Sequence, residues 1–156
     1  MFIGLSAKPN TDDLCPTTNT GKLIAAIEDG FVDGIGICRT NTVKCAPLDA
    51  NGKLRYPTER EMKSCLPSLI SEIQAVAPKV IVPLGGQVAR FLLQHLGNGT
   101  GFPGFGPDFS YKNYSLALGH VMPIHHPSYI WIYRRKRIDE YVDRVVEQLT
   151  ELAHVI

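Results

Sequence analysis

Short apolar runs alternate with stretches of helical periodicity along the chain. The runs at residues 1–5, 34–41, 79–85 and 115–124 predict four β-strands. Near-continuously apolar strands that alternate with helices are typical of a parallel sheet covered on both faces. The pattern therefore predicts an α/β fold, a three-layer α/β/α arrangement around a central four-stranded, mostly parallel sheet, with residues 1–156 forming a single domain.

Polar positions predict where the helices begin and end. Thr58 and Glu61 form a capping-box pattern before a helical stripe, and Pro67 is expected to kink or divide that helix. Gly30 is a candidate C-cap. The predicted helices span residues 20–30, 58–78, 86–96 and about 133–154.

Composition narrows the class of protein. Hydrophobic residues make up 44% and charged residues 20% of the chain, as in an ordinary globular protein. A net charge of +1 gives no global reason to expect nucleic acid, so any such reason must come from local clusters. No apolar run approaches the roughly 18 residues of a membrane helix, and no basic region precedes the apolar start at residues 1–5. We therefore expect a cytoplasmic protein without a membrane partner, and we take it to be a monomer.

The carboxyl ends of the predicted strands carry the candidate chemistry, because parallel α/β sheets bind their ligands there. The third strand ends at Gly85 and Gly86, where helix N-terminal amides could receive a phosphate; a tight turn that needs a positive φ is the simpler interpretation. The fourth strand ends at His125 and His126, and a neutral imidazole there can donate to a developing oxyanion or act in acid–base chemistry. Asn41 ends the second strand, and its amide offers both the donor and the acceptor needed to read a pyrimidine edge.

An apolar segment and then a basic segment follow the two histidines. Ile130 and Trp131 are expected to project from the rim of the site as a wedge between stacked bases, while Arg134, Arg135 and Lys136 hold phosphates. The alternative is a helix that buries the apolar residues against the sheet and leaves the cations in solvent.

Taken together, these segments resemble the uracil-DNA glycosylase superfamily, and most closely its iron–sulfur branch. The resemblance runs from Met1 to about Tyr133. It rests on "TNTVKCAP", on "YPTEREMKSCLPSLISEIQAVAPKVIVPLGGQVARFLL" and on the closing "HHPSY". It implies base-excision repair: hydrolysis of the N-glycosidic bond of uracil, or of another deaminated base, with single- or double-stranded DNA as the partner.

The resemblance also implies roles for individual residues. Asn41 matches the residue that reads the uracil edge, His126 matches the residue that stabilises the departing base, and Gly4 opens the first motif. The substrate-binding residues expected at the strand ends are Gly4, Leu5, Ser6, Asn41, Gly85, His125 and Ser128.

The first motif departs from the family pattern. Leu5 stands where the branch has a glutamate that positions or activates water, and no aromatic occurs near Pro16 to stack on the base. Asp12 is the expected catalytic substitute for the missing carboxylate. Cys45 and Cys65 match two of the four cluster ligands, which makes them weak metal candidates; without a full ligand set we expect no cofactor.

Two other classes of function stay open. One is a catalytically weak or inactive member that binds nucleic acid or a free base. The other is a metal-dependent hydrolase that uses His120, His125, His126 and nearby thiols. The enzyme assignment is therefore an expectation that leans towards a uracil-DNA glycosylase-type N-glycosyl hydrolase.

Overall fold

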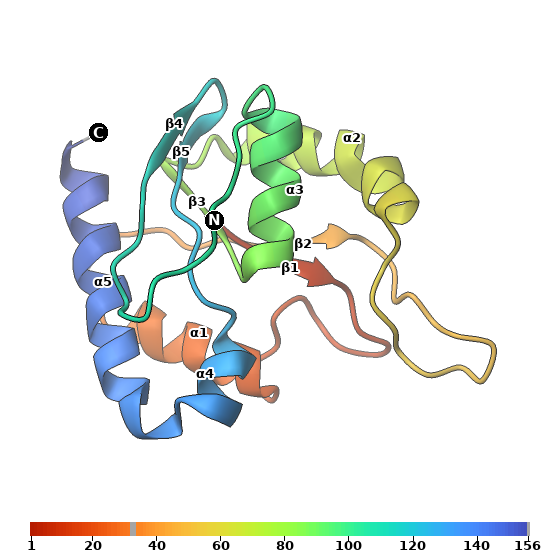
Figure 1. Ribbon diagram of the computed structural model, residues 1–156, viewed down its shortest axis with the longest axis horizontal. Coiled ribbons are helices and arrows are strands. Elements are labelled where there is room, and N and C mark those ends of the chain that lie inside the picture. The colour runs from red at the N-terminus through yellow and green to blue at the C-terminus, as the bar shows by residue number, and fades with distance from the viewer. Residues whose placement is uncertain (32–33, 156) are drawn as a thin grey trace.

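A twisted sheet forms the middle layer of the protein (Figure 1). The structure is a computed structural model, and it describes residues 1–31 and 34–155. Within these residues the sheet has five strands in the order β2-β1-β3-β5-β4, and β4 alone runs antiparallel to its neighbour. The strands are β1 (Phe2–Ser6), β2 (Arg39–Val43), β3 (Val80–Pro83), β4 (Tyr114–Leu116) and β5 (Gly119–Val121).

Helices cover both faces of the sheet. The helices are α1 (Asn19–Asp29), α2 (Glu59–Val76), α3 (Gly86–Leu96), α4 (Pro127–Tyr133) and α5 (Ile138–Val155), with a 3₁₀ turn at Arg135–Arg137. Figure 1 shows α1, α4 and α5 on one side and α2 and α3 on the other. Each side has its own apolar cluster, one built around Ile24, Ile130 and Tyr141 and the other around Ile73 and Leu92. This is the predicted three-layer α/β/α fold, with one strand more than expected.

The extra strand comes from the segment 115–124, which we expected to form one strand. It folds instead as the hairpin of β4 and β5, with Ser115 opposite His120. Gly119, at φ +122°, provides the sharp reversal. The neighbouring Ala117 and Leu118 read as strand residues because they are apolar.

The interior of one helix, the start of another helix and the start of one strand also differ from the expectation. Helix α2 begins with the predicted capping box, in which Thr58 accepts from Glu61 and Glu61 accepts from Thr58, but it runs through Pro67 without a break. The predicted closing helix begins at Ile138 rather than at residue 133. The 3₁₀ turn at Arg135–Arg137 separates it from α4. The second strand starts at Arg39, whereas its predicted first residues, 34–38, are not in a strand.

No helix among residues 1–31 and 34–155 combines the length and the apolar character that crossing a bilayer requires.

Candidate active site

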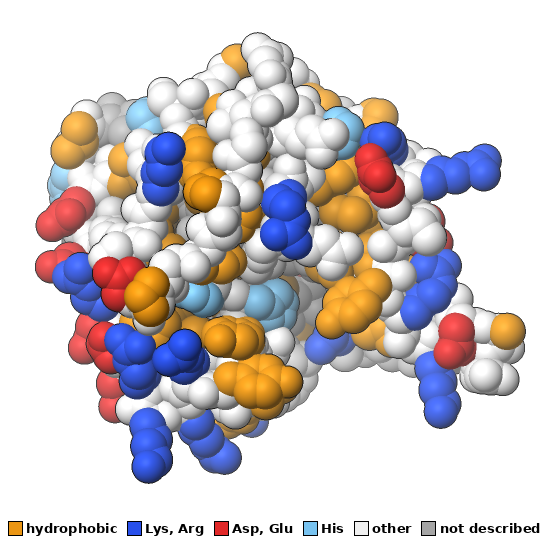
Figure 2. Space-filling model, in the orientation of Figure 1, with side chains coloured by type: hydrophobic (Ala, Val, Ile, Leu, Met, Phe, Trp, Pro, Cys, Tyr) orange, Lys and Arg blue, Asp and Glu red, His pale blue; other side chains and the backbone are white. Residues whose placement is uncertain are grey.

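A cavity of about 1010 Å³ opens at the carboxyl ends of β1 and β3, where the fold rule places it. Figure 2 shows the hollow, with histidine side chains beside it and hydrophobic side chains on two sides of its mouth. The predicted site residues that line it are Gly4, Leu5, Ser6, Asp12, Asn41, Gly85, His126 and Ser128.

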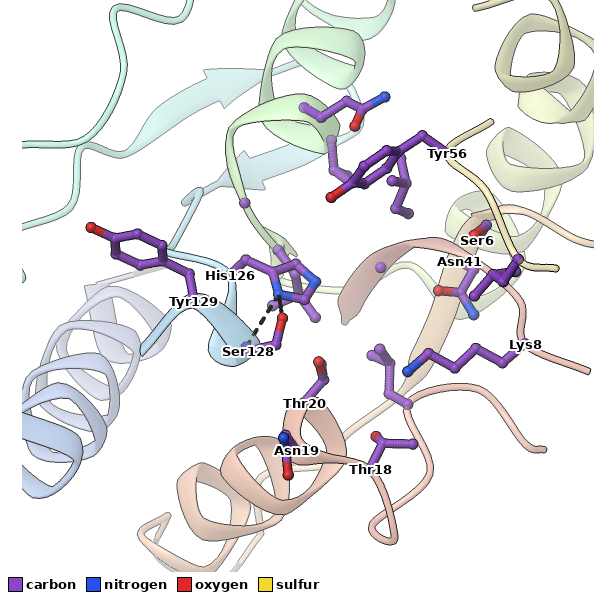
Figure 3. A pocket seen from close by; sticks show the side chains of 18 of the residues that line it. Ser6, Lys8, Thr18, Asn19, Thr20, Asn41, Tyr56, His126, Ser128 and Tyr129 are labelled. Carbon is purple, nitrogen blue, oxygen red and sulfur yellow. Dashed lines mark hydrogen bonds between the residues drawn. The ribbon is translucent and has the colours of Figure 1, made fainter. Parts of the chain in front are cut away.

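His126 stands at the N-cap of α4 and is held there by hydrogen bonds. Its Nδ1 accepts from the backbone N–H of Ser128 at 3.2 Å and lies 2.7 Å from the hydroxyl of the same residue. An N–H group can only donate, so Nδ1 carries no proton and a neutral ring has its proton on Nε2. Figure 3 shows the other edge of the ring facing the open space in front of Asn41. The site therefore presents a fixed N–H donor.

The surroundings of His126 keep it neutral. Burial first, and the positive charge of Lys8 second, together lower the pKa of His126 to about 4. Its Nε2–H is consequently available at neutral pH without the cost of a buried cation.

A glycine makes room for this imidazole. Gly85 has φ +88°, as the tight-turn interpretation predicts, and a Cβ added there would lie 3.0 Å from the Cβ of His126. The turn before α3 and the loop before α4 are thus packed against each other with no space for a side chain at Gly85.

Asn41 lies on the opposite side of the cavity from His126 (Figure 3). It belongs to the interior of β2, directly opposite Gly4 on β1, and is 3% exposed. A Cβ on Gly4 would come within 2.3 Å of the Asn41 Oδ1, so only glycine permits this side chain position. Gly4 and Asn41, both expected as site residues, are therefore in direct contact, although Asn41 lies inside β2 and does not end the strand as we expected.

Two neighbouring aspartates differ in their surroundings. Asp13 Oδ1 accepts from the Asn41 Nδ2 at 2.5 Å, which orients the amide. Asp12, the expected catalytic carboxylate, is exposed and lines the cavity. No sequence pattern distinguishes Asp13 from Asp12 as the neighbour of Asn41, because the difference depends on how the loop turns.

The loop that carries Lys8, Asp12 and Asp13 is tied down at its far end. Arg39 donates to the carboxylate of Glu28 and, at 3.1 Å, to the carbonyl of Leu14. The Thr18 hydroxyl caps α1 by accepting from Gly21 N at 3.0 Å. These contacts join the loop to the sheet edge and to the first turn of α1.

The comparisons with known proteins agree with this geometry. The sequence profile of the family described as "Uracil DNA glycosylase superfamily" matches residues 10–150. The chain belongs to the uracil DNA glycosylase superfamily. A type-4 uracil-DNA glycosylase of Sulfurisphaera tokodaii is 29% identical over 99 residues, which are 64% of this chain. The matched region is only 35% of that protein's length, about a third.

Not every residue expected at this superfamily site lies in the cavity. Within the described part of the chain, His125 lies outside the cavity wall, and its Nδ1 is 2.9 Å from the Tyr111 hydroxyl. Ile130, expected at the rim, is fully buried in the core. Trp131 is half-buried, with Lys22 and Arg135 over its ring.

Ile130 was misplaced because α4 turns it towards the sheet. Ile132 of this helix is exposed instead, at 62%, and it lines the cavity. The three expected phosphate-binding cations, Arg134, Arg135 and Lys136, are exposed, as both interpretations of this segment require.

The four cysteines do not make a cluster site. Cys15, Cys38, Cys45 and Cys65 are free thiols. Across residues 1–31 and 34–155, no three His, Cys, Asp or Glu side chains converge in a way that could hold a metal. The residues therefore do not fit the iron–sulfur cluster of the branch that the sequence resembles.

The same finding counts against the metal-dependent hydrolase. The histidines expected to share a metal each have a different neighbour: His120 Nδ1 is 2.9 Å from the Asn113 Nδ2, while His125 and His126 contact Tyr111 and Ser128. They are not assembled into one site.

Two residues of the site were missed by the sequence analysis. Lys8 extends its ammonium group into the space between Asn41 and His126 (Figure 3). Tyr56, from the hairpin loop after β2, extends over the same space (Figure 3) and is 79% exposed. Its backbone is held by Arg55, which donates to the Tyr56 carbonyl at 3.0 Å and pairs with Glu61. Neither position carries a motif signal, since each depends on a loop conformation.

Proposed function

We propose that this superfamily member is a base-excision repair glycosylase that hydrolyses the N-glycosidic bond of uracil, or of another deaminated base, in DNA. The observation that carries the proposal is the neutral His126, fixed as an Nε2–H donor on the opposite side of the cavity from Asn41 (Figure 3). DNA is the partner, and the cytoplasm is the location that we expect.

The base must leave the stack to reach this cavity, since the glycosidic bond is inaccessible inside a duplex. Asn41 is suited to reading its polar edge because the amide donates and accepts, and Asp13 holds the amide in one orientation. Tyr56 is suited to covering the face of the base, as aromatic side chains do for extruded bases.

Bond cleavage separates charge in a defined way. The C1′–N1 bond breaks, its electron pair stays with the base, and the sugar becomes cation-like. The neutral His126 N–H donates to the anionic base, and the ammonium of Lys8 adds a favourable positive charge. The neutral His126 ring holds its proton on Nε2 before the reaction begins. It can therefore stabilise the anionic base without reorganisation of the site.

Water then completes hydrolysis at C1′, and its proton leaves to a carboxylate or to solvent. Asp12 is our candidate for that carboxylate because it lines the cavity while Leu5 occupies the motif position. Loss of a positioned general base typically costs about 100- to 10,000-fold, so a slow enzyme is expected if Asp12 acts poorly.

A second candidate function is a binder without catalysis. The apolar Leu5 on the cavity wall favours it, since it cannot activate water. Such a protein would bind DNA with a steep salt dependence and release no base.

Mass spectrometry of the released base separates the two functions. Oligonucleotides with one uracil, hypoxanthine or xanthine, as single strands and as duplexes, are incubated with excess protein. Release of at least one free base supports the glycosylase. Binding of these strands without release from any of them supports the binder instead.

A further inference from the structure

Four aromatic rings form a row, and the last two of them line the mouth of the cavity. Phe105 and His125 are stacked with centroids 4.4 Å apart and planes at 28°. His125 and Tyr129 follow at 6.0 Å and 16°, and Tyr129 and Tyr133 at 5.2 Å and 41°. We call these four residues the aromatic row.

Hydrogen bonds to His125 hold the inner end of the aromatic row, which consists of Phe105 and His125. The His125 carbonyl accepts from the Tyr141 hydroxyl at 2.9 Å, and its Nδ1 lies 2.9 Å from the Tyr111 hydroxyl. Burial, together with the positive charges of Arg134 and Arg137, lowers the pKa of His125, so its ring is neutral and stacks as an aromatic. The inner rings are therefore a rigid support for the outer ones.

The outer end of the row is open to solvent. Tyr129 and Tyr133 are four residues apart on α4, which places them on one side of the helix. They are 40% and 71% exposed, and both line the cavity mouth together with Ile132. In Figure 2 hydrophobic side chains border the hollow beside a group of Lys and Arg side chains.

The cations at the end of the row are available for a partner. Within residues 1–31 and 34–155, Arg134 and Lys136 form no ion pair, whereas Arg137 is paired with Glu140. Aromatic faces next to unpaired cations are the two components of surfaces that bind single-stranded nucleic acids.

We propose that the aromatic row is a stacking platform for single-stranded DNA, which holds the nucleotides on one side of the excised base. The proposal rests on the proposed function and names its substrate class. Tyr129 and Tyr133 together form the exposed surface on which the bases stack, while Arg134 and Lys136 contact the phosphates. Paired bases in a duplex have both faces covered by their neighbours, so they cannot use such a platform. A single strand can use it whatever its sequence, since every base has a flat face.

Binding of undamaged DNA tests this platform separately from catalysis. Fluorescence anisotropy with a labelled 15-nucleotide oligothymidine, alone and annealed to its complement, gives Kd for the wild type and for Tyr133→Leu, Tyr133→Phe and Tyr129→Leu. Leu48→Ala, an exposed apolar residue on the hairpin across the cavity, is the matched control. Circular dichroism confirms that each variant is folded.

The platform predicts tighter binding of the single strand than of the duplex. Tyr133→Leu and Tyr129→Leu should each weaken single-strand binding by at least about fivefold, from a stacking energy of about 1 kcal/mol or more per base. Tyr133→Phe and Leu48→Ala should stay within about twofold of the wild type. Duplex binding as tight as single-strand binding, or leucine variants that bind like the wild type, would overturn the proposal. Oligothymidine contains no base for the enzyme to excise. The binding result therefore does not depend on the outcome of the base-release experiment described under the proposed function.

Discussion

Asp13 accepts a hydrogen bond from the side-chain amide of Asn41 at 2.5 Å. This contact joins the loop after β1 to the interior of β2 and decides which way the Asn41 amide faces. An amide that is free to flip would exchange its donor and its acceptor and would read a different base edge.

Exchange of Asp13 for asparagine should therefore affect recognition more than chemistry. Asp13→Asn is expected to raise KM for uracil-containing DNA about tenfold, the effect of losing roughly 1.4 kcal/mol from a charge-assisted hydrogen bond, with a smaller change in kcat. The matched variant is Asp12→Asn, whose side chain lines the cavity and should lower kcat with little change in KM. Steady-state kinetics of both variants measures these changes. The same changes in KM and kcat in both variants would contradict separate roles for Asp12 and Asp13.

Gly4 should tolerate no side chain. The Cβ of Gly4→Ala would fall 2.3 Å from the Asn41 Oδ1, so Asn41 must leave its position. We expect excision to fall at least 100-fold, comparable to the loss of a positioned donor. Gly101→Ala is the control, since nothing lies within 4 Å of its added Cβ. Base release and thermal unfolding of both variants test the point; Gly4→Ala with wild-type excision would mean that Asn41 is not needed where it lies.

Tyr56 should contribute an aromatic face to the base. Tyr56→Ala is expected to weaken binding of the uracil-containing strand by about 5- to 100-fold, from about 1–3 kcal/mol of stacking, while Tyr56→Phe retains most of it. Thermal stability should stay unchanged in both variants because this side chain is 79% exposed. Equal binding by the alanine variant and the wild type would remove Tyr56 from the site.

The lowered pKa of His126 predicts a pH dependence of stability. The folded protein binds the His126 proton only near pH 4, whereas the unfolded chain binds it near pH 6.5. Between these values the unfolded state holds more protons, so stability falls as the pH falls from about 6.5 to about 4.

The wild type should accordingly lose up to about 2 kcal/mol more than His126→Gln between pH 7 and pH 5. Urea unfolding at the two pH values gives the comparison. His125, whose pKa is also lowered, is present in both proteins, so its contribution cancels. An equal loss in wild type and variant would show that His126 is not held neutral.

The fold was largely predictable because apolar periodicity reports directly on burial. The strands around Ile3 and Ile81 and the helix stripe through Leu69 and Ile73 all lie in the core as expected. The hairpin at β4 and β5 was missed because its turn residues Ala117 and Leu118 are apolar, so nothing but Gly119 marks the reversal.

Site residues were predictable from the sequence only where they lie on strands or directly after them. The parallel sheet brings Gly4 on β1, Asn41 inside β2 and His126 between β5 and α4 together from distant parts of the sequence. Lys8 and Tyr56 enter the cavity through loop conformations set by contacts such as that of Arg55 with Glu61, and no periodic pattern encodes these. Ile130 was misplaced for a related reason: the phase of a seven-residue helix decides which side chain faces out.

We propose that a neutral His126 and an oriented Asn41 together release a base from DNA. Single-turnover excision from a labelled single strand with one uracil, followed by alkaline cleavage at the abasic site, measures this directly. The account predicts cleavage by the wild type and a rate lower by about 100- to 1,000-fold in His126→Ala, the cost of a lost oxyanion donor. Asn41→Ala should be slowed as well, and Leu48→Ala should cleave like the wild type. Cleavage that is unchanged in His126→Ala and Asn41→Ala, or absent from the wild type at high protein concentration, would contradict it.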